Sequence, residues 1–306
     1  MKKDFLSIAD WSTDELFELI DLSKKIKKNP EEYKNALQGK SIATIFEKQS
    51  LRTHVTFDVG IYQLGAHAIY LTQSDISLGK RESVYDTGKN LERWVDGIVV
   101  RTYAHKTCTD LAKAVKIPVI NALTDFEHPC QALGDFLTVH EKMWSFSGKK
   151  FVFIGDGNNV CHSLMLFAGK VGMNFVACTP KGYEPDKKVF KTASDAAKRM
   201  ESMVEVINDP KEAVKDADVI YTDVWASMGQ EAEKEKRMVV FKNYQVNKKL
   251  FSMAKKSTIF MHCLPAHRGE EVTDEVIDSK NSVVFDEAEN RLHSQKAIMI
   301  KLMKES

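Results

Sequence analysis

The sequence lacks a charge excess and a long apolar run, and each absence excludes a class of protein. Its 44 basic and 43 acidic residues give a net charge of +1, whereas nucleic-acid and membrane-surface proteins normally carry a basic excess. No apolar run approaches the roughly 18 residues of a membrane-spanning helix, and the opening MKKDFLSIADW has no apolar stretch of the kind found in signal peptides. We therefore expect no nucleic-acid partner and no membrane association.

The sequence also lacks a cysteine framework. Its five cysteines are odd in number, scattered and without a C-x-x-C pair, which is typical of reduced thiols in a cytoplasmic protein and not of disulfides or a zinc site. We find no internal repeat and no low-complexity tract. The chain has 306 residues and is 43% hydrophobic, enough to bury the cores of two domains. We expect a cytoplasmic globular protein without a bound metal.

The first half of the chain alternates between amphipathic stretches and short apolar runs. Ser12 and Glu15 have capping-box spacing at the start of a helix over 12–28, and SIATIF (41–46) is typical of a buried strand. Further helices are expected at 53–65, 83–95, 108–115 and 128–144, and further strands at 66–71, 96–103 and 117–122. Strands that alternate with helices of this length predict a mainly parallel sheet covered on both faces.

A second alternating series follows SFSGKK (145–150), the most probable domain boundary in the sequence. Strands are expected at 151–156, 174–179, 204–208 and 218–224, and helices near Asn158 and at 188–203 and 210–217. The final elements are expected at 258–264 and 282–290, followed by a terminal helix near 290–304. The charged run QEAEKEKR (230–237) is interpreted as a solvated loop or helix face. The pattern predicts an α/β protein of two doubly wound domains, in which ligands bind beyond the carboxyl ends of the strands.

The segment SLRT, Ser50 to Thr53, follows the first expected strand directly. Ser50 can be an ordinary helix N-cap, with Arg52 solvated in the first turn. Alternatively the segment binds an anion, because a helix N-terminus offers unpaired backbone N–H groups and a partial positive charge. These residues alone do not decide between the two interpretations.

The segment GDGNNV (155–160) is half of a dinucleotide fingerprint. Val160 replaces the third glycine of G-x-G-x-x-G, and the next strand ends in CTPKG without an acidic residue to hold a ribose. We therefore exclude a nicotinamide dehydrogenase. Asn158 and Asn159 can instead address the carboxylate or ammonium group of an amino acid.

Four further strand ends carry polar side chains. Arg101 closes one strand, His128 and Gln131 lie in HPCQ at a helix start, Asp223 closes DVIYTD and Cys263 lies in HCLP. Each has an alternative structural role: Arg101 as a surface residue, His128 as a helix cap, Cys263 as a small buried apolar residue. Their joint occurrence at one edge of two sheets favours a functional site.

Six motifs in order, FEKQSLRT, HPCQ, GDGNNV, DVWASMGQE, HCLP and EAENR, resemble the aspartate/ornithine carbamoyltransferase family, on its ornithine branch, across residues 5 to 303. The resemblance implies two α/β domains joined by two long helices. Residues 1–140 would bind carbamoyl phosphate, residues 141–287 would bind ornithine, and a helix over 288–306 would pack back on the first domain. It also implies carbamoyl transfer from carbamoyl phosphate to L-ornithine, giving L-citrulline, without metal or organic cofactor. A homotrimer with active sites shared between subunits is expected, and higher assembly is left open.

The resemblance also implies a role for individual residues. The carbamoyl-phosphate site would consist of Ser50, Leu51, Arg52, Thr53, Arg101, His128, Gln131, Cys263, Leu264 and Arg291, with Ser77 contributed by a neighbouring subunit's loop SDISLGKRES (74–83). The ornithine site would consist of Asn159, Asp223, Ser227 and Met228. Among these residues, catalysis would depend on Arg52, Arg101, His128, Asp223 and Cys263.

The sequence departs from the family pattern in the anion-binding segment. The family usually has Ser-Thr-Arg-Thr-Arg, whereas here Leu51 replaces the first Thr and His54 the second Arg. Leu51 keeps the backbone N–H that binds phosphate, and we interpret His54 as a packing residue. Ornithine enzymes commonly have Gln where this chain has Ser77, and in Leu51 the chain also resembles the branch that carbamoylates acylated ornithine. The alternatives are therefore a carbamoyltransferase for N-acylated ornithine or putrescine, or a non-catalytic relative.

Overall fold

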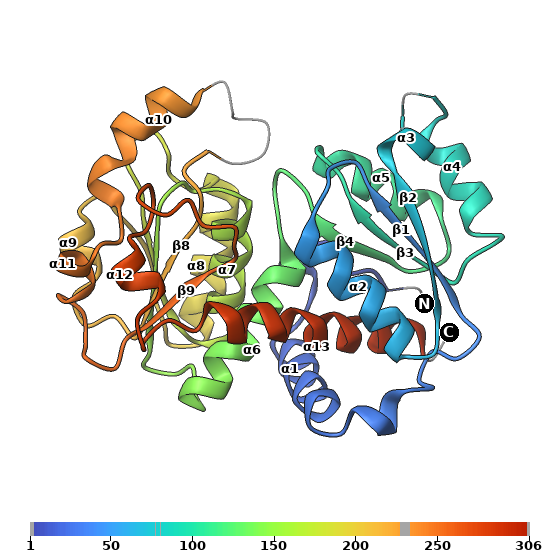
Figure 1. Cartoon of the computed structure of the whole chain (residues 1–306), viewed down its shortest axis with the longest axis horizontal. Helices are drawn as coiled ribbons and strands as arrows, with labels where there is room; N and C mark the ends of the chain where they lie inside the picture. The colour runs from blue at the N-terminus through green and yellow to red at the C-terminus, as the bar shows by residue number, and fades with distance from the viewer. Residues whose placement is uncertain (1–2, 77, 80, 227–232, 305–306) are drawn as a thin grey trace. The chain divides into compact units, whose positions relative to one another are not determined.

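The computed structural model describes residues 3–76, 78–79, 81–226 and 233–304. The chain divides into two compact units (Figure 1). Unit 1 comprises Met1–Leu137 and Glu289–Ser306, and unit 2 comprises Thr138–Ala288. The division falls inside two long helices, α6 (Pro129–Met143) and α13 (Val284–Met303).

Unit 1 contains a parallel sheet of four strands in the order β2-β1-β3-β4. The strands are β1 (Ser41–Phe46), β2 (His67–Thr72), β3 (Gly97–Arg101) and β4 (Val119–Leu123). The helices of unit 1 are η1 (Ile8–Asp10), α1 (Thr13–Lys28), η2 (Pro30–Tyr33), α2 (Leu51–Gln63), α3 (Gln73–Ile76), α4 (Val84–Leu91) and α5 (His105–Ala114).

The start of α1 shows how local sequence defines a helix boundary. The Ser12 side chain accepts from the backbone N–H of Glu15, and the Glu15 carboxylate accepts from the backbone N–H of Ser12. This reciprocal pair satisfies two donors that a helix start leaves without intrahelical partners. The predicted capping box is confirmed, and α1 buries Leu16, Leu19 and Ile20.

Unit 2 contains a parallel sheet of five strands in the order β7-β6-β5-β8-β9. The strands are β5 (Lys150–Ile154), β6 (Asn174–Cys178), β7 (Val204–Ile207), β8 (Val219–Thr222) and β9 (Ile259–His262). The helices are α7 (Asn159–Val171), α8 (Lys187–Arg199), α9 (Pro210–Ala213), α10 (Lys234–Phe241), η4 (Lys242–Tyr244), α11 (Lys248–Phe251) and α12 (Asp274–Ile277).

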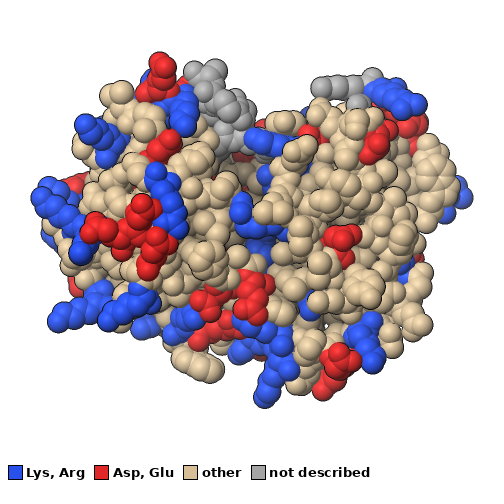
Figure 2. Space-filling model, viewed as in Figure 1, with Lys and Arg blue, Asp and Glu red and all other residues tan. Residues whose placement is uncertain are grey.

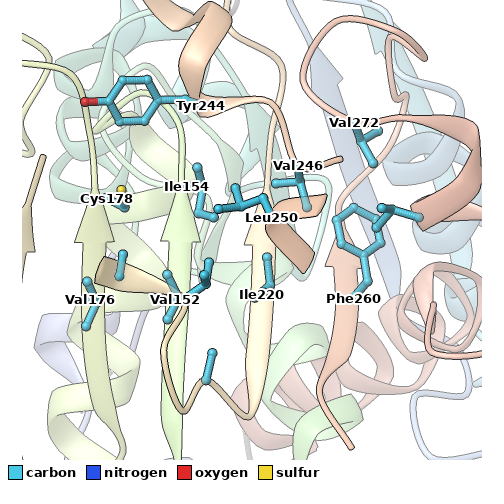
Figure 3. Close-up of a cluster of buried hydrophobic side chains, with 14 of the residues drawn as sticks. Val152, Ile154, Val176, Cys178, Ile220, Tyr244, Val246, Leu250, Phe260 and Val272 are labelled. Atoms are coloured by element: carbon cyan, nitrogen blue, oxygen red, sulfur yellow. The ribbon is translucent and has the colours of Figure 1, made fainter. Parts of the chain in front are cut away.

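Each unit has its own hydrophobic core beside its sheet. In unit 2, side chains from β5, β6, β8 and β9 pack with Tyr244, Val246 and Leu250 (Figure 3). In unit 1, a separate cluster joins β1, β3 and β4 to α4 and α5. Full burial of one large aliphatic or aromatic side chain contributes about 1.5–3 kcal/mol, so both cores hold their strand ends in fixed positions.

The predicted α/β class with parallel sheets is confirmed, and two local predictions are wrong. The terminal helix begins at Val284, so most of 282–290 is the start of α13 and not a separate element. The run 230–237 is not solvated throughout, because Arg237 is only 5% exposed.

No helix among the described residues has both the length and the apolar character needed to cross a bilayer. On the face drawn in Figure 2, basic and acidic side chains are interspersed. This distribution agrees with the balanced composition of the sequence.

We predict that Gly169→Ala destabilises unit 2. In most helix interiors this change adds about 1 kcal/mol of stability, but a Cβ at Gly169 on α7 would lie 2.4 Å from the carbonyl oxygen of Ala193 on α8. The two helices would have to separate, at a cost of about 1–3 kcal/mol. Urea unfolding should show the loss, whereas the exposed Thr192→Ala on α8 should be neutral or slightly stabilising. Equal stability of Gly169→Ala and the unmodified chain would contradict the close packing of these helices.

Candidate active site

The carboxyl ends of the unit 1 strands bring the predicted anion-binding residues together. Phe46 at the end of β1 pairs with Arg101 at the end of β3, and Arg101 pairs with Leu123 at the end of β4. The segment that starts α2 follows β1, and His128 follows β4 immediately before α6. Parallel pairing therefore places Arg101, His128 and the α2 start at one edge of the sheet.

The start of α2 has the geometry predicted for an N-cap. The Ser50 side chain accepts from the backbone N–H of Thr53 at 3.4 Å, so α2 begins at Leu51. Leu51 is 75% exposed, and its backbone N–H belongs to the first turn of α2. Thr53 is buried. The first-turn N–H groups that Ser50 does not bind can bind an anion.

Three hydrogen bonds join the side chains of the predicted phosphate site in unit 1. The Thr53 hydroxyl accepts from Arg101 at 3.4 Å and from Arg291 at 3.1 Å. Arg291 also donates to the side-chain oxygen of Gln131, whose amide donates to Asp135 at 2.7 Å. Arg291 is 2% exposed. It lies 160 residues after Gln131 in the sequence, so the fold brings these two side chains together. The Gln131 oxygen, predicted to accept from a carbamoyl NH2, already accepts from Arg291, but an amide oxygen has a second lone pair.

His128 is buried among positive charges. Burial lowers the pKa of His128 well below its ordinary value, and Arg291, Arg101 and Arg52 lower this pKa further because they repel an imidazolium. The ring is therefore neutral at physiological pH. A neutral imidazole still carries one N–H donor, so His128 can donate a hydrogen bond to an oxygen that gains negative charge.

A cavity of about 560 Å³ lies beside the α2 start in unit 1. It is lined by Ser50, Leu51, His54, Tyr70 and residues of the neighbouring strand ends. The His54 ring stacks on Tyr70, with ring centroids 3.8 Å apart. This stacking agrees with the interpretation of His54 as a packing residue.

In unit 2, the ends of β5, β8 and β9 bring Asp223 and Cys263 together. The Cys263 thiol donates to one Asp223 carboxylate oxygen at 3.1 Å, and the Asn158 amide donates to the other at 2.8 Å. The Asn158 oxygen also caps α7, because it accepts from the backbone N–H groups of Val160 and Cys161. Asp223 is 7% exposed and Cys263 is half-buried, so a carboxylate and a thiol lie side by side at this strand edge.

A buried network holds the backbone on both sides of Cys263. One ring nitrogen of His262 accepts from the backbone N–H of Leu264 at 2.8 Å, and the other lies 3.2 Å from the Glu271 carboxylate. The backbone N–H of His262 donates to Glu287 at 2.9 Å. Leu264 has a φ of +57° and precedes a cis proline bond. The network therefore holds Cys263 and Leu264 in one orientation.

Arg237 links the same strand ends from the interior of unit 2. Its guanidinium donates to the Asp156 carboxylate at 2.7 Å and to the Trp225 carbonyl at 2.9 Å. It also lies over the Tyr183 ring, 5.0 Å from the centroid. Asp156 is two residues before Asn158, and Trp225 is two residues after Asp223. The ion pair therefore fixes the two backbone segments that carry the hydrogen-bonded pair Asn158 and Asp223.

The second glycine of the dinucleotide-like segment packs against protein backbone. A Cβ at Gly157 would lie 2.3 Å from the backbone nitrogen of Pro185, and the Gly157 N–H donates to the Tyr183 carbonyl. In a dinucleotide fingerprint the corresponding glycine allows the backbone to approach a pyrophosphate. Here the backbone of residues 183–185 lies close to Gly157, at the position that a pyrophosphate would take. This packing agrees with the exclusion of a nicotinamide site.

The side chains of Asp223, His262 and Cys263 lie close enough together to form a candidate metal site. The two ring nitrogens of His262 are, however, directed at the Leu264 N–H and at Glu271. The imidazole therefore has no free lone pair for a metal ion. These contacts favour a hydrogen-bonding role for the group.

The structure leaves part of the predicted site undescribed. Ser77, Ser227 and Met228 lie outside the described residues. Asn159 is 9% exposed at the first position of α7, next to Asn158, which makes the contact to Asp223. Three contacts of this region have no signal in the sequence: Asn158 with Asp223, His262 with Glu271, and Arg237 with Asp156. Each joins two residues whose motifs or runs are visible in the sequence only separately.

Comparison with protein families gives two matches that together cover most of the chain. The model described as aspartate/ornithine carbamoyltransferase, carbamoyl-P binding domain, matches residues 3–141. The model described as aspartate/ornithine carbamoyltransferase, Asp/Orn binding domain, matches residues 147–302.

Individual relatives agree with the family models. The ornithine carbamoyltransferase of Pyrococcus horikoshii is 53% identical over 303 residues, which cover 98% of this chain and 96% of that protein. The solved structure of ornithine carbamoyltransferase from Pyrococcus furiosus has a TM-score of 0.96 and 51% identity, and covers 99% of this chain and 97% of that one. A structure described as acetylornithine transcarbamylase complexed with acetylcitrulline has a TM-score of 0.89 and 31% identity, covering 98% of this chain and 99% of that one.

We predict that His128 makes the protein less stable in mild acid. The unfolded chain binds a proton on this histidine near its ordinary pKa of 6.5, whereas the folded protein, with its lowered pKa, does not. Stability is therefore present above pH 6.5 and is lost as pH falls below it, by at most about 1.4 kcal/mol per pH unit.

Calorimetric unfolding temperatures at pH 7.5 and 5.5 test this prediction. His128→Gln should lose less stability over this interval than the unmodified chain. His105 and His293, whose pKa values burial also lowers, remain in both proteins and serve as the common background. An equal acid-induced decrease in both proteins would show that His128 is charged in the folded state.

Proposed function

The chain belongs to the aspartate/ornithine carbamoyltransferase family, and from this membership we propose that it transfers the carbamoyl group of carbamoyl phosphate to the δ-amine of L-ornithine. The products are L-citrulline and phosphate. The resemblance found from the six motifs is thereby confirmed. The observation that carries the substrate assignment is the 53% identity, over nearly the whole of both chains, to a protein named ornithine carbamoyltransferase.

The cationic cluster of unit 1 supports binding of carbamoyl phosphate. Arg101 and Arg291 both donate to the Thr53 hydroxyl, and together with Arg52 they lower the pKa of the buried His128, so positive charge is concentrated at this strand edge. Guanidinium groups bind phosphate oxygens with charge-assisted, often bidentate hydrogen bonds. The leaving phosphate keeps its negative charge throughout the reaction, so these groups stabilise it before and after transfer.

The carbamoyl oxygen is the second group that needs stabilisation, because it gains negative charge when the amine attacks. We assign Thr53, Arg101 and neutral His128 as its donors, and Gln131 as the partner of the carbamoyl NH2. Loss of one preorganised donor to such an oxygen typically costs about 2.7–4 kcal/mol of barrier. A neutral His128 suits this role, since it donates a hydrogen bond without transferring a proton.

The hydrogen-bonded strand ends of unit 2 support binding of the amino acid. We assign Asp223 and Cys263 to orient the ornithine amine, with Asn159, Ser227 and Met228 in the remainder of the ornithine site and Leu264 beside carbamoyl phosphate. A free alkyl ammonium has a pKa of about 10.4, and a carboxylate alone would raise it. Desolvation and the arginines must therefore favour the neutral amine, and the leaving phosphate is a suitable proton acceptor.

The proposal extends to assembly and cellular role. The active unit is a homotrimer in which Ser77 of a neighbouring copy contacts carbamoyl phosphate. All five cysteines carry free thiols, which suits the reducing cytoplasm. The Pyrococcus furiosus relative, 52% identical, is named as anabolic, so the proposed direction is citrulline formation for arginine biosynthesis.

A citrulline assay with four amines tests the substrate assignment. We expect kcat/KM for L-ornithine to exceed that for N-acetylornithine and putrescine by at least tenfold, with aspartate inactive. Putrescine lacks the carboxylate expected at Asn159, and N-acetylornithine lacks the cationic α-amine. A buried polar or charged group without its partner costs about 1–3 kcal/mol, which is about a ten- to hundredfold loss in kcat/KM.

Arg52→Ala provides the control for this assay, because removal of one phosphate-binding cation should abolish formation of the carbamoylated product from every amine. Equal or faster use of N-acetylornithine would favour the acylornithine branch and overturn the substrate assignment alone. If no amine gave a carbamoylated product, the chain would be a non-catalytic relative.

A further inference from the structure

A segment near the start of the chain runs beside β4, the strand that ends at the His128 region. Phe5 donates to the Val119 carbonyl at 2.9 Å, and Asn121 donates to the Phe5 carbonyl at 2.8 Å. The Asp4 carboxylate accepts from the Val119 N–H, and the Leu6 carbonyl accepts from the Asn121 side chain. Residues 4–8, which we call the strap, are therefore bonded to the first part of β4, from Val119 to Asn121.

The strap ends at a buried carboxylate. Glu127 is 2% exposed, and its two carboxylate oxygens accept from the Ser7 hydroxyl and, at 3.2 Å, from the Ile8 backbone N–H. A buried carboxylate is stable only when it is hydrogen-bonded. The strap therefore supplies hydrogen bonds that make burial of the Glu127 carboxylate possible, and the same two bonds hold Ser7 and Ile8 of the strap in place.

The backbone of Glu127 is held as firmly as its side chain. Its carbonyl accepts from the Thr124 N–H at 2.9 Å, and its N–H donates to the Thr124 hydroxyl at 3.2 Å. The next residue is His128, whose carbonyl accepts from the N–H groups of Gln131 and Ala132 at the start of α6. The position of His128 is thus fixed by Glu127 on one side and by α6 on the other.

We propose that the strap is a positioning element for His128 and acts through the Glu127 carboxylate. The inference rests on the proposed function, in which His128 donates to the carbamoyl oxygen. Such a donor must lie about 2.7–3.1 Å from the oxygen, so a small displacement of residue 127 weakens this contact. The phosphate contacts come from Arg291 and the α2 start, whereas the strap bonds to β4 and to Glu127.

Two ligands separate the positioning role from a general loss of structure. Inorganic phosphate needs only the phosphate contacts. Phosphonoacetamide, in which CH2 replaces the bridging oxygen of carbamoyl phosphate, also has the carbonyl oxygen that His128 contacts, and it cannot react. Calorimetric Kd values for both ligands, measured with the full chain, therefore report on His128 without requiring turnover.

Glu127→Gln keeps the size of the side chain but replaces one acceptor oxygen by an NH2, which cannot accept from Ser7 or Ile8. We expect its Kd for phosphonoacetamide to rise at least tenfold and its Kd for phosphate to stay within twofold. Ser7→Ala, which removes one donor only, should raise the phosphonoacetamide Kd about threefold. The double variant should bind phosphonoacetamide no more weakly than Glu127→Gln, because both substitutions interrupt the same connection between the strap and Glu127.

Glu92→Gln is the matched control. Glu92 also accepts from a backbone N–H in unit 1, that of Lys116 at 2.7 Å, but it does not adjoin His128. Its Kd values for both ligands should be unchanged.

The proposal is overturned if Glu127→Gln and Ser7→Ala bind phosphonoacetamide as tightly as the unmodified chain. It is also overturned if both ligands weaken together, or if Glu92→Gln shows the same selective loss. A chain that makes no citrulline but shows the selective loss would refute the proposed reaction and keep the strap's role. A chain that binds neither ligand would refute both.

Discussion

The buried guanidinium of Arg291 is the interaction on which the phosphate site depends. Arg291 reaches from α13 to Gln131 on α6 and to Thr53 on α2, so three helices of unit 1 meet at one cation. Gly134 makes this contact possible, since a Cβ there would lie 3.2 Å from the Arg291 side chain and 3.5 Å from its backbone. A buried cation is costly unless it is paired and hydrogen-bonded, so the surrounding helices must keep these positions.

The hydrogen-bond partners of Arg291, Gln131 and Thr53, are neutral. Arg291 also lies near His128, and so do Arg101 and Arg52. Three like charges near one point repel each other, and an anion with several charges relieves this repulsion. Burial, reinforced by the same three charges, lowers the pKa of His128 and keeps its ring neutral, so one arrangement of residues binds phosphate and prepares a donor for the carbamoyl oxygen. Unit 2 uses a different principle: Asp223 is held by Asn158 and Cys263, and hydrogen bonds rather than excess charge define its site.

Much of the fold and the general location of the candidate site could be predicted from local sequence patterns. The strand SIATIF, the capping box at Ser12 and the polar strand ends are all encoded within a few residues. The missed contacts join residues far apart in the chain: Arg237 with Asp156, or Ser7 with Glu127. The charged neighbours of Arg237 in QEAEKEKR predict a solvated side chain, and only the folded structure shows that this side chain turns to the interior. The sequence predicts too late a start for α13, because SVV, which opens 282–290, is equally typical of a strand.

The Arg291 charge is required for phosphate binding and not for folding. Lys296 provides the comparison, because it is a second buried cation on α13 and bonds only to Gln63 among the described residues. The decisive measurement is the calorimetric Kd for inorganic phosphate of Arg291→Gln and Lys296→Gln. We expect at least a tenfold loss of affinity for Arg291→Gln, since a hydrogen bond to a charged group contributes about 1.5–3 kcal/mol, and no change for Lys296→Gln. Unchanged affinity in a folded Arg291→Gln protein, or an equal loss in both variants, would show that phosphate binding does not depend on the Arg291 charge.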